Sequence, residues 1–232
     1  EGEFIKYMEH FKPFLSLGLS NCEEHQVCAV AIGVVGDICR ALEAAVEPYC
    51  DEIVRLLLVN LQNPNLNRNV KPPILSCFGD VALAVGGKFE KYMRVTMSML
   101  VQASGTTVDP ENPDLVDYLN QLREGIFEAY TGVLQGLRAD GKADVFQPHM
   151  MGVLDLIRQV AESVATKTAT EEVVCAAVGV VGDCGSALGL TFKNIAKQSP
   201  QHEAIKALLK EAVKSGGKSA ELAAWTRSEC GL

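Results

Sequence analysis

The sequence has no excess of basic residues, no long apolar run and few aromatic side chains. Lys and Arg number 21 against 29 Asp and Glu, a formal net charge of −8. A nucleic-acid binder would show a basic face, and a membrane span needs about 18 consecutive apolar residues. The chain therefore predicts neither nucleic acid nor membrane as a partner. Its acidity favours a basic partner or simply keeps the chain soluble, and charge alone does not decide between the two.

Residue patterns for catalysis, metal binding or a disulfide framework are also missing. None of the eight cysteines forms a Cys-x-x-Cys pair, and most fall on apolar positions of helical stretches. We expect them to be buried thiols in a reducing compartment. The four histidines are scattered, and the sequence lacks a nucleophile elbow, a Walker loop and a dinucleotide fingerprint. We therefore predict no enzyme activity, no cofactor and no metal site.

A repeated segment is what the sequence does contain. Val27-Cys-Ala-Val-Ala-Ile-Gly-Val-Val-Gly-Asp37 recurs almost unchanged as Val174-Cys-Ala-Ala-Val-Gly-Val-Val-Gly-Asp183. Weaker copies run over residues 70–80 and 122–132. The aligned positions Gly36, Gly79, Thr131 and Gly182 are separated by 43, 52 and 51 residues. A period of this length indicates stacked supersecondary units rather than one globular core.

The apolar residues recur every three or four positions, which predicts helices and no sheet. We expect an all-α superhelix of about five helical hairpins, each with a first helix (A) and a second helix (B), as one array over residues 1–232. The approximate repeats are 1–43, 44–86, 87–140, 141–190 and 191–232. The predicted A and B helices pair as 3–19 with 23–42, 47–61 with 67–84, 89–102 with 114–137, 145–161 with 170–188, and 200–213 with 218–230.

Two local features refine this scheme. Gly2-Glu-Phe-Ile-Lys-Tyr-Met8 recurs two repeats later as Gly87-Lys-Phe-Glu-Lys-Tyr-Met93, an offset of 85 residues. The Gly-Asp copies two repeats apart, at 36 and 131, are offset by 95, so ten extra residues must lie between Met93 and Leu122. The breaker-rich stretch Ser104–Pro113 predicts a loop insertion there.

The glycines at 33, 36, 179 and 182 each cost about 1 kcal/mol inside a helix. We expect close packing of the A and B helices to offset that cost, with close approach of a ligand backbone as the alternative.

The B-helix pattern resembles the HEAT repeat, a helical hairpin whose copies stack into a superhelix. Longer segments resemble the C-terminal third of importin-β, a receptor of the karyopherin-β family, so the chain is expected to be a fragment of a longer array. These segments are Gly2-Glu-Phe-Ile-Lys-Tyr-Met, Phe11-Lys-Pro-Phe-Leu, Val70-Lys-Pro-Pro-Ile-Leu-Ser, Phe78-Gly-Asp-Val-Ala-Leu-Ala-Val-Gly-Gly, Val116-Asp-Tyr-Leu-Asn, Glu128-Ala-Tyr-Thr-Gly-Val-Leu-Gln-Gly-Leu and Leu222-Ala-Ala-Trp-Thr.

The resemblance implies a nuclear import receptor found in cytoplasm and nucleus and at the nuclear pore and nuclear envelope. Its partners would be the basic importin-β-binding helix of importin-α, or a basic cargo segment, held in the concave groove. Phe-Gly repeats of nucleoporins would bind the outer A-helix surface. Ran-GTP would act mainly through N-terminal and central repeats that this chain lacks.

Candidate groove residues follow from the helix period. Positions 29, 33, 36, 37 and 40 share one side of a B helix, opposite Val27, Val35, Ile38 and Leu42. If the latter set is buried, Asp37 faces the groove, as do its counterparts in the other repeats. The carboxylates predicted to line the groove are Asp37, Asp80, Glu128 and Asp183. An equally open alternative is that each carboxylate only hydrogen-bonds a neighbouring repeat.

Trp225 is the fifth candidate, because the family has a tryptophan there that stacks on the bound helix. Capping of the terminal repeat is an equal alternative for this side chain. The tail Ser228-Glu-Cys-Gly-Leu232 departs from the basic residues of the family, so the family's tail contacts are not carried over to this chain. Nucleoporin clefts would need residues such as Phe14, Leu17, Val54 and Leu58, which base rates place in the core. We therefore predict no residues for that site.

A HEAT-repeat scaffold that holds other proteins in a fixed array is the alternative function. A receptor predicts an acidic inner groove, whereas a scaffold predicts a ladder of contacts between repeats without a charge bias. The placement of charge therefore discriminates between the two.

Overall fold

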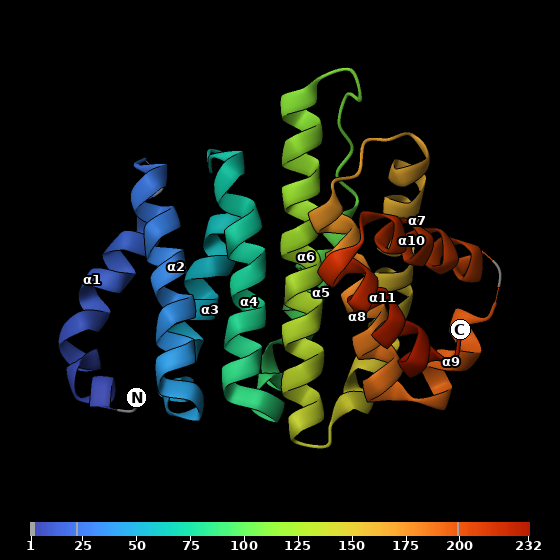
Figure 1. Ribbon diagram of the computed structural model, residues 1–232. Coiled ribbons are helices and arrows are strands. Elements are labelled where there is room, and N and C mark those ends of the chain that lie inside the picture. The colour runs from blue at the N-terminus through green and yellow to red at the C-terminus, as the bar shows by residue number, and fades with distance from the viewer. Residues whose placement is uncertain (1–2, 22, 199) are drawn as a thin grey trace.

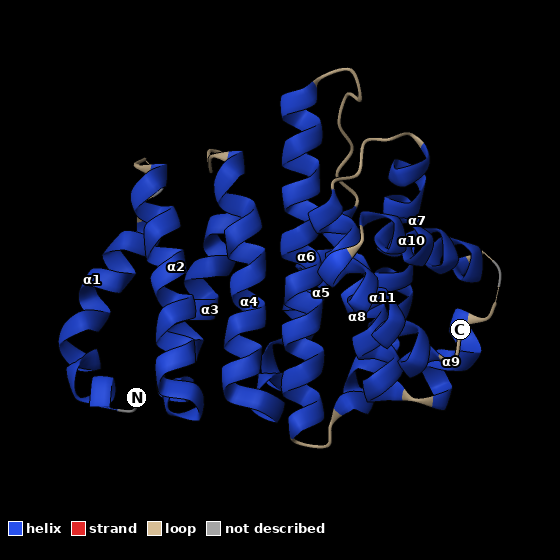
Figure 2. Ribbon diagram, in the orientation of Figure 1, coloured by secondary structure: helices blue, strands red, loops and turns tan. Residues whose placement is uncertain are grey.

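The computed structural model describes residues 3–21, 23–198 and 200–232. These residues form helices joined by short loops, with no strand among them (Figure 2). Gly2 and Cys22 lie outside the described residues. No helix in the described part of the chain has the length and hydropathy to cross a membrane.

The five predicted helical hairpins are present. Successive hairpins are joined by the 3₁₀ turns Glu43–Val46, Gly86–Phe89 and Ala143–His149, whereas Glu3–Tyr7 precedes the first helix and Arg68–Val70 lies within the second hairpin. The A helices are α1 (Met8–Ser20), α3 (Glu47–Gln62), α5 (Glu90–Ser104), α7 (Met150–Ala165) and α10 (Gln201–Ser215). The B helices are α2 (His25–Leu42), α4 (Lys71–Val85), α6 (Pro113–Ala139), α8 (Glu171–Leu188) and α11 (Gly217–Cys230). A short helix that the sequence did not predict, α9 (Leu190–Ala196), precedes the last hairpin.

The B helices form a continuous row in which each helix packs on the next. α4 lies between α2 and α6, and α8 lies between α6 and α11. Figure 1 shows α2, α4 and α6 side by side and nearly parallel, with α3 and α5 behind them. The core runs along this row without a break, and its largest members include Phe78, Phe127 and Phe146, all 0% exposed. The stack is therefore the unit that buries apolar surface.

The glycines of the repeated motif allow close contact between successive B helices, which corrects the expectation of close A–B packing. A Cβ on Gly36 would lie 2.6 Å from Oδ2 of Asp80 on α4. One on Gly132 of α6 would lie 2.5 Å from the Cα of Gly79 on α4. Gly33 and Gly179 have nothing within 4 Å. The period of one hairpin could not show this, because the close partner belongs to the next repeat.

Two helix starts explain the shape of the middle of the array. α4 begins at Lys71, later than predicted, because Pro72 and Pro73 fit only its first turn. The predicted insertion is a loop between α5 and α6, and Asn112 caps α6 by accepting a hydrogen bond from the backbone N–H of Leu115 at 3.2 Å. α6 has 27 residues and extends past its neighbours at the top of Figure 1.

Several side chains lie where the sequence did not place them. Val27, grouped with the buried face of α2, is 46% exposed. Phe14 and Leu17 of α1, expected in the core, are 70% and 69% exposed, whereas Val54 is buried and Leu58 partly buried. The predicted burial of the cysteines is confirmed for most of the set: Cys28, Cys39, Cys50, Cys77, Cys184 and Cys230 are buried, and Cys175 is partly buried.

Candidate binding face of the B helices

The predicted carboxylates come from four successive B helices and differ in how open they are. Asp37 on α2 and Glu128 on α6 are exposed. Asp80 on α4 keeps 31% of its side chain exposed. Asp183 on α8 is only 9% exposed. The period of the motif therefore placed all four on one side of the array but did not distinguish open carboxylates from enclosed ones.

Arg40 joins the first two carboxylates. Its Nη2 lies 2.8 Å from Oδ1 of Asp37, one turn earlier on α2, and its Nη1 lies 3.0 Å from Oδ1 of Asp80 on α4. Partial burial raises the pKa of Asp80; Arg40 opposes this rise, and Glu128 and Asp37 add to it. Asp80 therefore links two repeats and also belongs to a row of negative charge.

Asp183 links α8 to α6. Nε2 of Gln135 donates a hydrogen bond to its Oδ1 at 3.1 Å. Burial raises the pKa of Asp183, while hydrogen bonds from Gln135 and Thr131 and the charge of Arg138 lower it. The carboxylate is enclosed between two helices, as the alternative of a hydrogen bond to a neighbouring repeat predicts.

Sequence reasoning missed a second group of carboxylates, Glu124, Glu171 and Glu172. Burial raises the pKa of Glu124, and the charges of Glu172 and Glu128 raise it further, while a 3.4 Å hydrogen bond from Oγ1 of Thr170 opposes the rise. Glu171 accepts a 2.7 Å hydrogen bond from Oγ of Ser219 on α11. Glu171 and Glu172 precede the copy of the motif that starts at Val174, and Glu124 lies in its weak copy at a position that the other copies do not share. A capping Thr170 followed by two acids in the first turn of α8 was the available signal.

Trp225 lies on α11, the last B helix, with 38% of its surface exposed. Its ring packs on α8 at Gly182, where a Cβ would overlap the ring carbon Cζ3. The absent side chain of Gly182 therefore makes the space for the indole. The packed part of the ring fits the capping role, and stacking of the open part on a bound helix stays a prediction.

Ion pairs are distributed differently on the two sides of the array. The A side carries a ladder of pairs between repeats, among them Lys12–Glu52 at 3.6 Å, Lys91–Asp51 at 2.8 Å and Lys142–Glu90 at 2.8 Å. Among the described residues, Arg40 is the only cation that forms ion pairs with carboxylates of the B helices. The B-helix face can therefore accept cations from outside. No group of side chains in the described ranges is arranged to hold a metal ion.

Comparisons with known proteins give one consistent result. A family model described as importin subunit beta-1-like, TPR repeats, matches residues 1–213. Importin subunit beta-1 of Arabidopsis thaliana is 45% identical over 201 residues, covering 84% of this chain and 22% of that protein. The Schizosaccharomyces pombe protein of the same name is 44% identical over 184 residues, covering 79% of this chain and 21% of that protein. The chain thus spans about a fifth of the length of these relatives.

Solved structures agree with the sequence matches. A crystal structure of importin beta in an ammonium sulfate condition superposes with a TM-score of 0.90 at 35% identity, covering 99% of this chain and 26% of that one. A Kap95:Nup1 complex matches with a TM-score of 0.84 at 27% identity over 98% of this chain and 26% of that one. Kap95p in a structure with RanGDP matches with a TM-score of 0.84 at 28% identity, covering 99% of this chain and 27% of that one.

Proposed function

This chain belongs to the importin-β family, and on that premise we propose that it is a segment of a nuclear transport receptor that binds a basic helix along its B-helix face. The basic helix would be the importin-β-binding helix of importin-α or a basic cargo segment. The observation that carries the proposal is the surplus of carboxylates on the B helices, which have only Arg40 as an ion-pair partner among the described residues. A Lys- and Arg-rich helix is the complement of such a face.

The proposal gives the acidic residues two roles. Asp37, Glu128 and Glu172 are exposed and would meet cations of the partner directly. Asp80 and Asp183 hold neighbouring B helices in register through Arg40 and Gln135. Trp225 would stack its open face on a basic or aliphatic side chain, a contact of about 0.5–2 kcal/mol when the partner is a cation.

The test is the affinity of a labelled importin-β-binding helix for the triple variant Asp37→Asn, Glu128→Gln, Glu172→Gln. Exposed ion pairs contribute about 0.2–1 kcal/mol each, so we expect affinity to fall by about tenfold at low salt. The matched control, Glu111→Gln, Asp144→Asn, Asp155→Asn, removes the same charge from exposed positions outside this face. Equal affinity of the triple variant and this control would contradict the proposal.

A second readout is the pH dependence of binding. The pKa of Glu124 is raised above its ordinary value by burial and by Glu172 and Glu128, so this carboxylate becomes protonated earlier than a free glutamate as pH falls. A bound cation favours the ionised form. Binding should therefore release protons and weaken as pH falls through that raised pKa, and the triple variant should show less of this dependence.

Passage through the nuclear pore belongs to the same proposal, with the chain located in cytoplasm and nucleus and at the pore. For Phe-Gly nucleoporins we propose the outer cleft between α1 and α3, a hollow of about 10 Å³ lined by Leu15, Tyr49, Ile53 and Leu56, which would have to widen to admit a phenylalanine ring. A cleft between adjacent A helices is what a phenylalanine side chain requires, and a structural relative, Kap95, forms a complex with Nup1. We assign no Ran contact to this chain.

A further inference from the structure

A cavity of about 760 Å³ lies between the second and third hairpins, along the edge of the array where α6 extends beyond its neighbours (Figure 1). Its walls come from the end of α3, the start of α4, the end of α5, the inserted loop after Ser104 and the first turns of α6. The proposed binding face lies elsewhere, on the exposed side of the B-helix row. The insertion that interrupts the repeat period therefore supplies one wall of this cavity.

Short-range hydrogen bonds form turns at both ends of the inserted loop. The backbone N–H of Thr106 donates to the carbonyl of Ala103 at 3.1 Å. Oδ1 of Asp109 accepts a hydrogen bond from the backbone N–H of Glu111 at 3.0 Å, which closes a turn just before the Asn112 cap of α6. Thr106 and Asp109 both line the cavity, so these turns shape the part of the loop that borders it.

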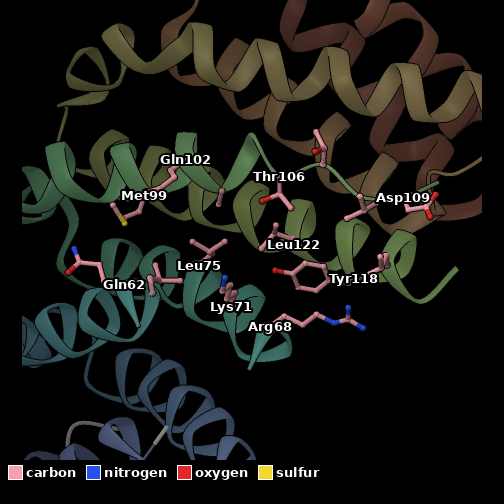
Figure 3. Close-up of a pocket in the computed structure, with 15 residues that line it drawn as sticks. Gln62, Arg68, Lys71, Leu75, Met99, Gln102, Thr106, Asp109, Tyr118 and Leu122 are labelled. Atoms are coloured by element: carbon pink, nitrogen blue, oxygen red, sulfur yellow. The ribbon is translucent and has the colours of Figure 1, made fainter. Parts of the chain in front are cut away.

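The cavity combines an apolar floor with basic side chains. Leu75 and Leu122 form part of the floor and are 1% and 2% exposed. Lys71 and Arg68 also line it, and neither forms an ion pair within the described part of the chain. The guanidinium of Arg68 lies 5.5 Å from the ring centre of Tyr118, and the ends of the Lys71 and Tyr118 side chains turn into the same space (Figure 3).

The charge of this cavity is opposite to that of the whole molecule. The chain carries a formal net charge of −8, yet two cations line the cavity against one carboxylate, that of Asp109. A lysine ammonium and a tyrosine hydroxyl beside an apolar floor suit a carboxylate flanked by an apolar side chain. A basic helix suited to the acidic B-helix face would be repelled here.

We propose that this cavity is a second docking site, for an acidic protein segment that places a carboxylate at Lys71 and Tyr118, within the field of the exposed Arg68 at the rim, and an adjacent aliphatic or aromatic side chain over Leu75 and Leu122. The site is independent of the proposed basic-helix face. It gives the chain two surfaces of opposite charge preference, so that a partner with both acidic and basic segments can occupy both.

The test selects, from a library of displayed random peptides, those that bind the whole chain but not a variant with altered cavity charges. Peptides that bind the Arg68→Glu, Lys71→Glu variant are removed, and those retained by the unaltered chain are sequenced. We expect Asp or Glu next to Leu, Ile, Phe or Tyr. Peptides without acidic residues, or no peptide that distinguishes the two proteins, would overturn the proposal.

Measured affinities of the selected peptides complete the test. They should fall by about tenfold or more in the Arg68→Glu, Lys71→Glu variant, and less in Arg68→Gln, Lys71→Gln, which keeps the side-chain size but adds no repulsion. The matched control, Arg55→Glu, Lys210→Glu, makes the same charge change at exposed positions outside the cavity and should leave affinity unchanged. An equal loss in this control would show a general charge effect and overturn the site. Thermal melting of each variant confirms that the proteins compared are folded.

Discussion

The glycine of the repeated Gly-Asp dipeptide makes room for a different side chain in different repeats. At Gly36 the absent side chain leaves room for Asp80 of the next B helix, whereas at Gly182 it leaves room for the ring of Trp225. In both places the residue that fills the space comes from the following repeat. The glycine's cost of about 1 kcal/mol in a helix interior is therefore offset by contact between repeats.

Gly182→Ala is expected to destabilise the last hairpin and to displace Trp225. The new Cβ would overlap Cζ3 of the ring, and overpacking of this kind costs about 1–3 kcal/mol. Trp225 is the single tryptophan, so its fluorescence should shift to longer wavelength as the ring becomes more exposed. Chemical denaturation should show a lower midpoint, and binding of a basic helix should weaken without any change of charge.

Gly179→Ala is the matched control, one turn earlier on α8. Nothing lies within 4 Å of the Cβ that would be added there, so the better helix propensity of alanine should stabilise the protein by up to about 1 kcal/mol. If Gly182→Ala were as stable as Gly179→Ala and left the emission of Trp225 unchanged, packing of Trp225 on α8 would not stabilise the last hairpin.

Among the candidate site residues, the sequence predicted which helix face they share better than how open they are. The helix period was enough to place Asp37, Asp80 and Asp183 on the B helices. Whether each is exposed depends on side chains of the neighbouring repeat, Arg40 for Asp80 and Gln135 for Asp183. Glu172 was missed because it lies outside the repeated motif. A period fixes positions within one repeat, and contacts between repeats need the structure.

Among the helical elements, three B helices end with the same backbone turn but not with the same residue. The residue after α4 is Gly86, with φ 58° and ψ −135°, and the residue after α8 is Gly189, with φ 54° and ψ −126°. The residue after α2 is Glu43, with φ 46° and ψ −133°. This positive-φ conformation is easily reached by glycine and is strained for glutamate.

Glu43→Gly should therefore stabilise the first hairpin. Relief of backbone strain is worth about 1–3 kcal/mol, and the greater chain entropy of glycine in the unfolded state offsets about 0.5–1 kcal/mol of it. A net gain of about 1 kcal/mol should appear as a higher denaturation midpoint. Glu43→Ala removes the same carboxylate but keeps the strain, so it should show no comparable gain. Equal stability of the two variants would contradict the strain argument.

The same elements show how much of the fold the sequence predicted. All five hairpins were predicted from the sequence, because apolar residues recur every three or four positions along the helices and the repeated motif recurs from one hairpin to the next. α9 was missed because its seven residues are too few for a period to show. The loop before α6 was predicted from its breakers, but its role as a cavity wall was not. That role depends on α4 and α5, which meet the loop only in the folded stack.

At the scale of the whole molecule, charge is separated by surface. Among the described residues the carboxylates of the B helices have Arg40 as their one ion-pair partner, the A helices carry ion pairs between repeats, and two cations line the cavity under the inserted loop. The α1–α3 cleft has an apolar floor, and the carboxylate of Glu52 at its rim is held by Ser16 at 3.0 Å and Lys12 at 3.6 Å. Because these surfaces lie on different sides of a stacked array, a partner on one should not alter the affinity of another.

Ionic strength should therefore change the affinity of a basic helix and the affinity of a Phe-Gly peptide by different amounts. Raising ionic strength from about 0.1 M to 1 M shortens the Debye length from about 10 Å to about 3 Å, so the affinity of a basic helix for the B-helix face should fall steeply. The affinity of a Phe-Gly peptide for the α1–α3 cleft should change little, because that contact is apolar. Tyr49→Ser should weaken only the Phe-Gly peptide, and Asp37→Asn, Glu128→Gln, Glu172→Gln only the basic helix, both measured by titration at each salt. Parallel salt dependence of the two ligands, or a loss of basic-helix binding in Tyr49→Ser, would mean that they share one surface and would overturn this division.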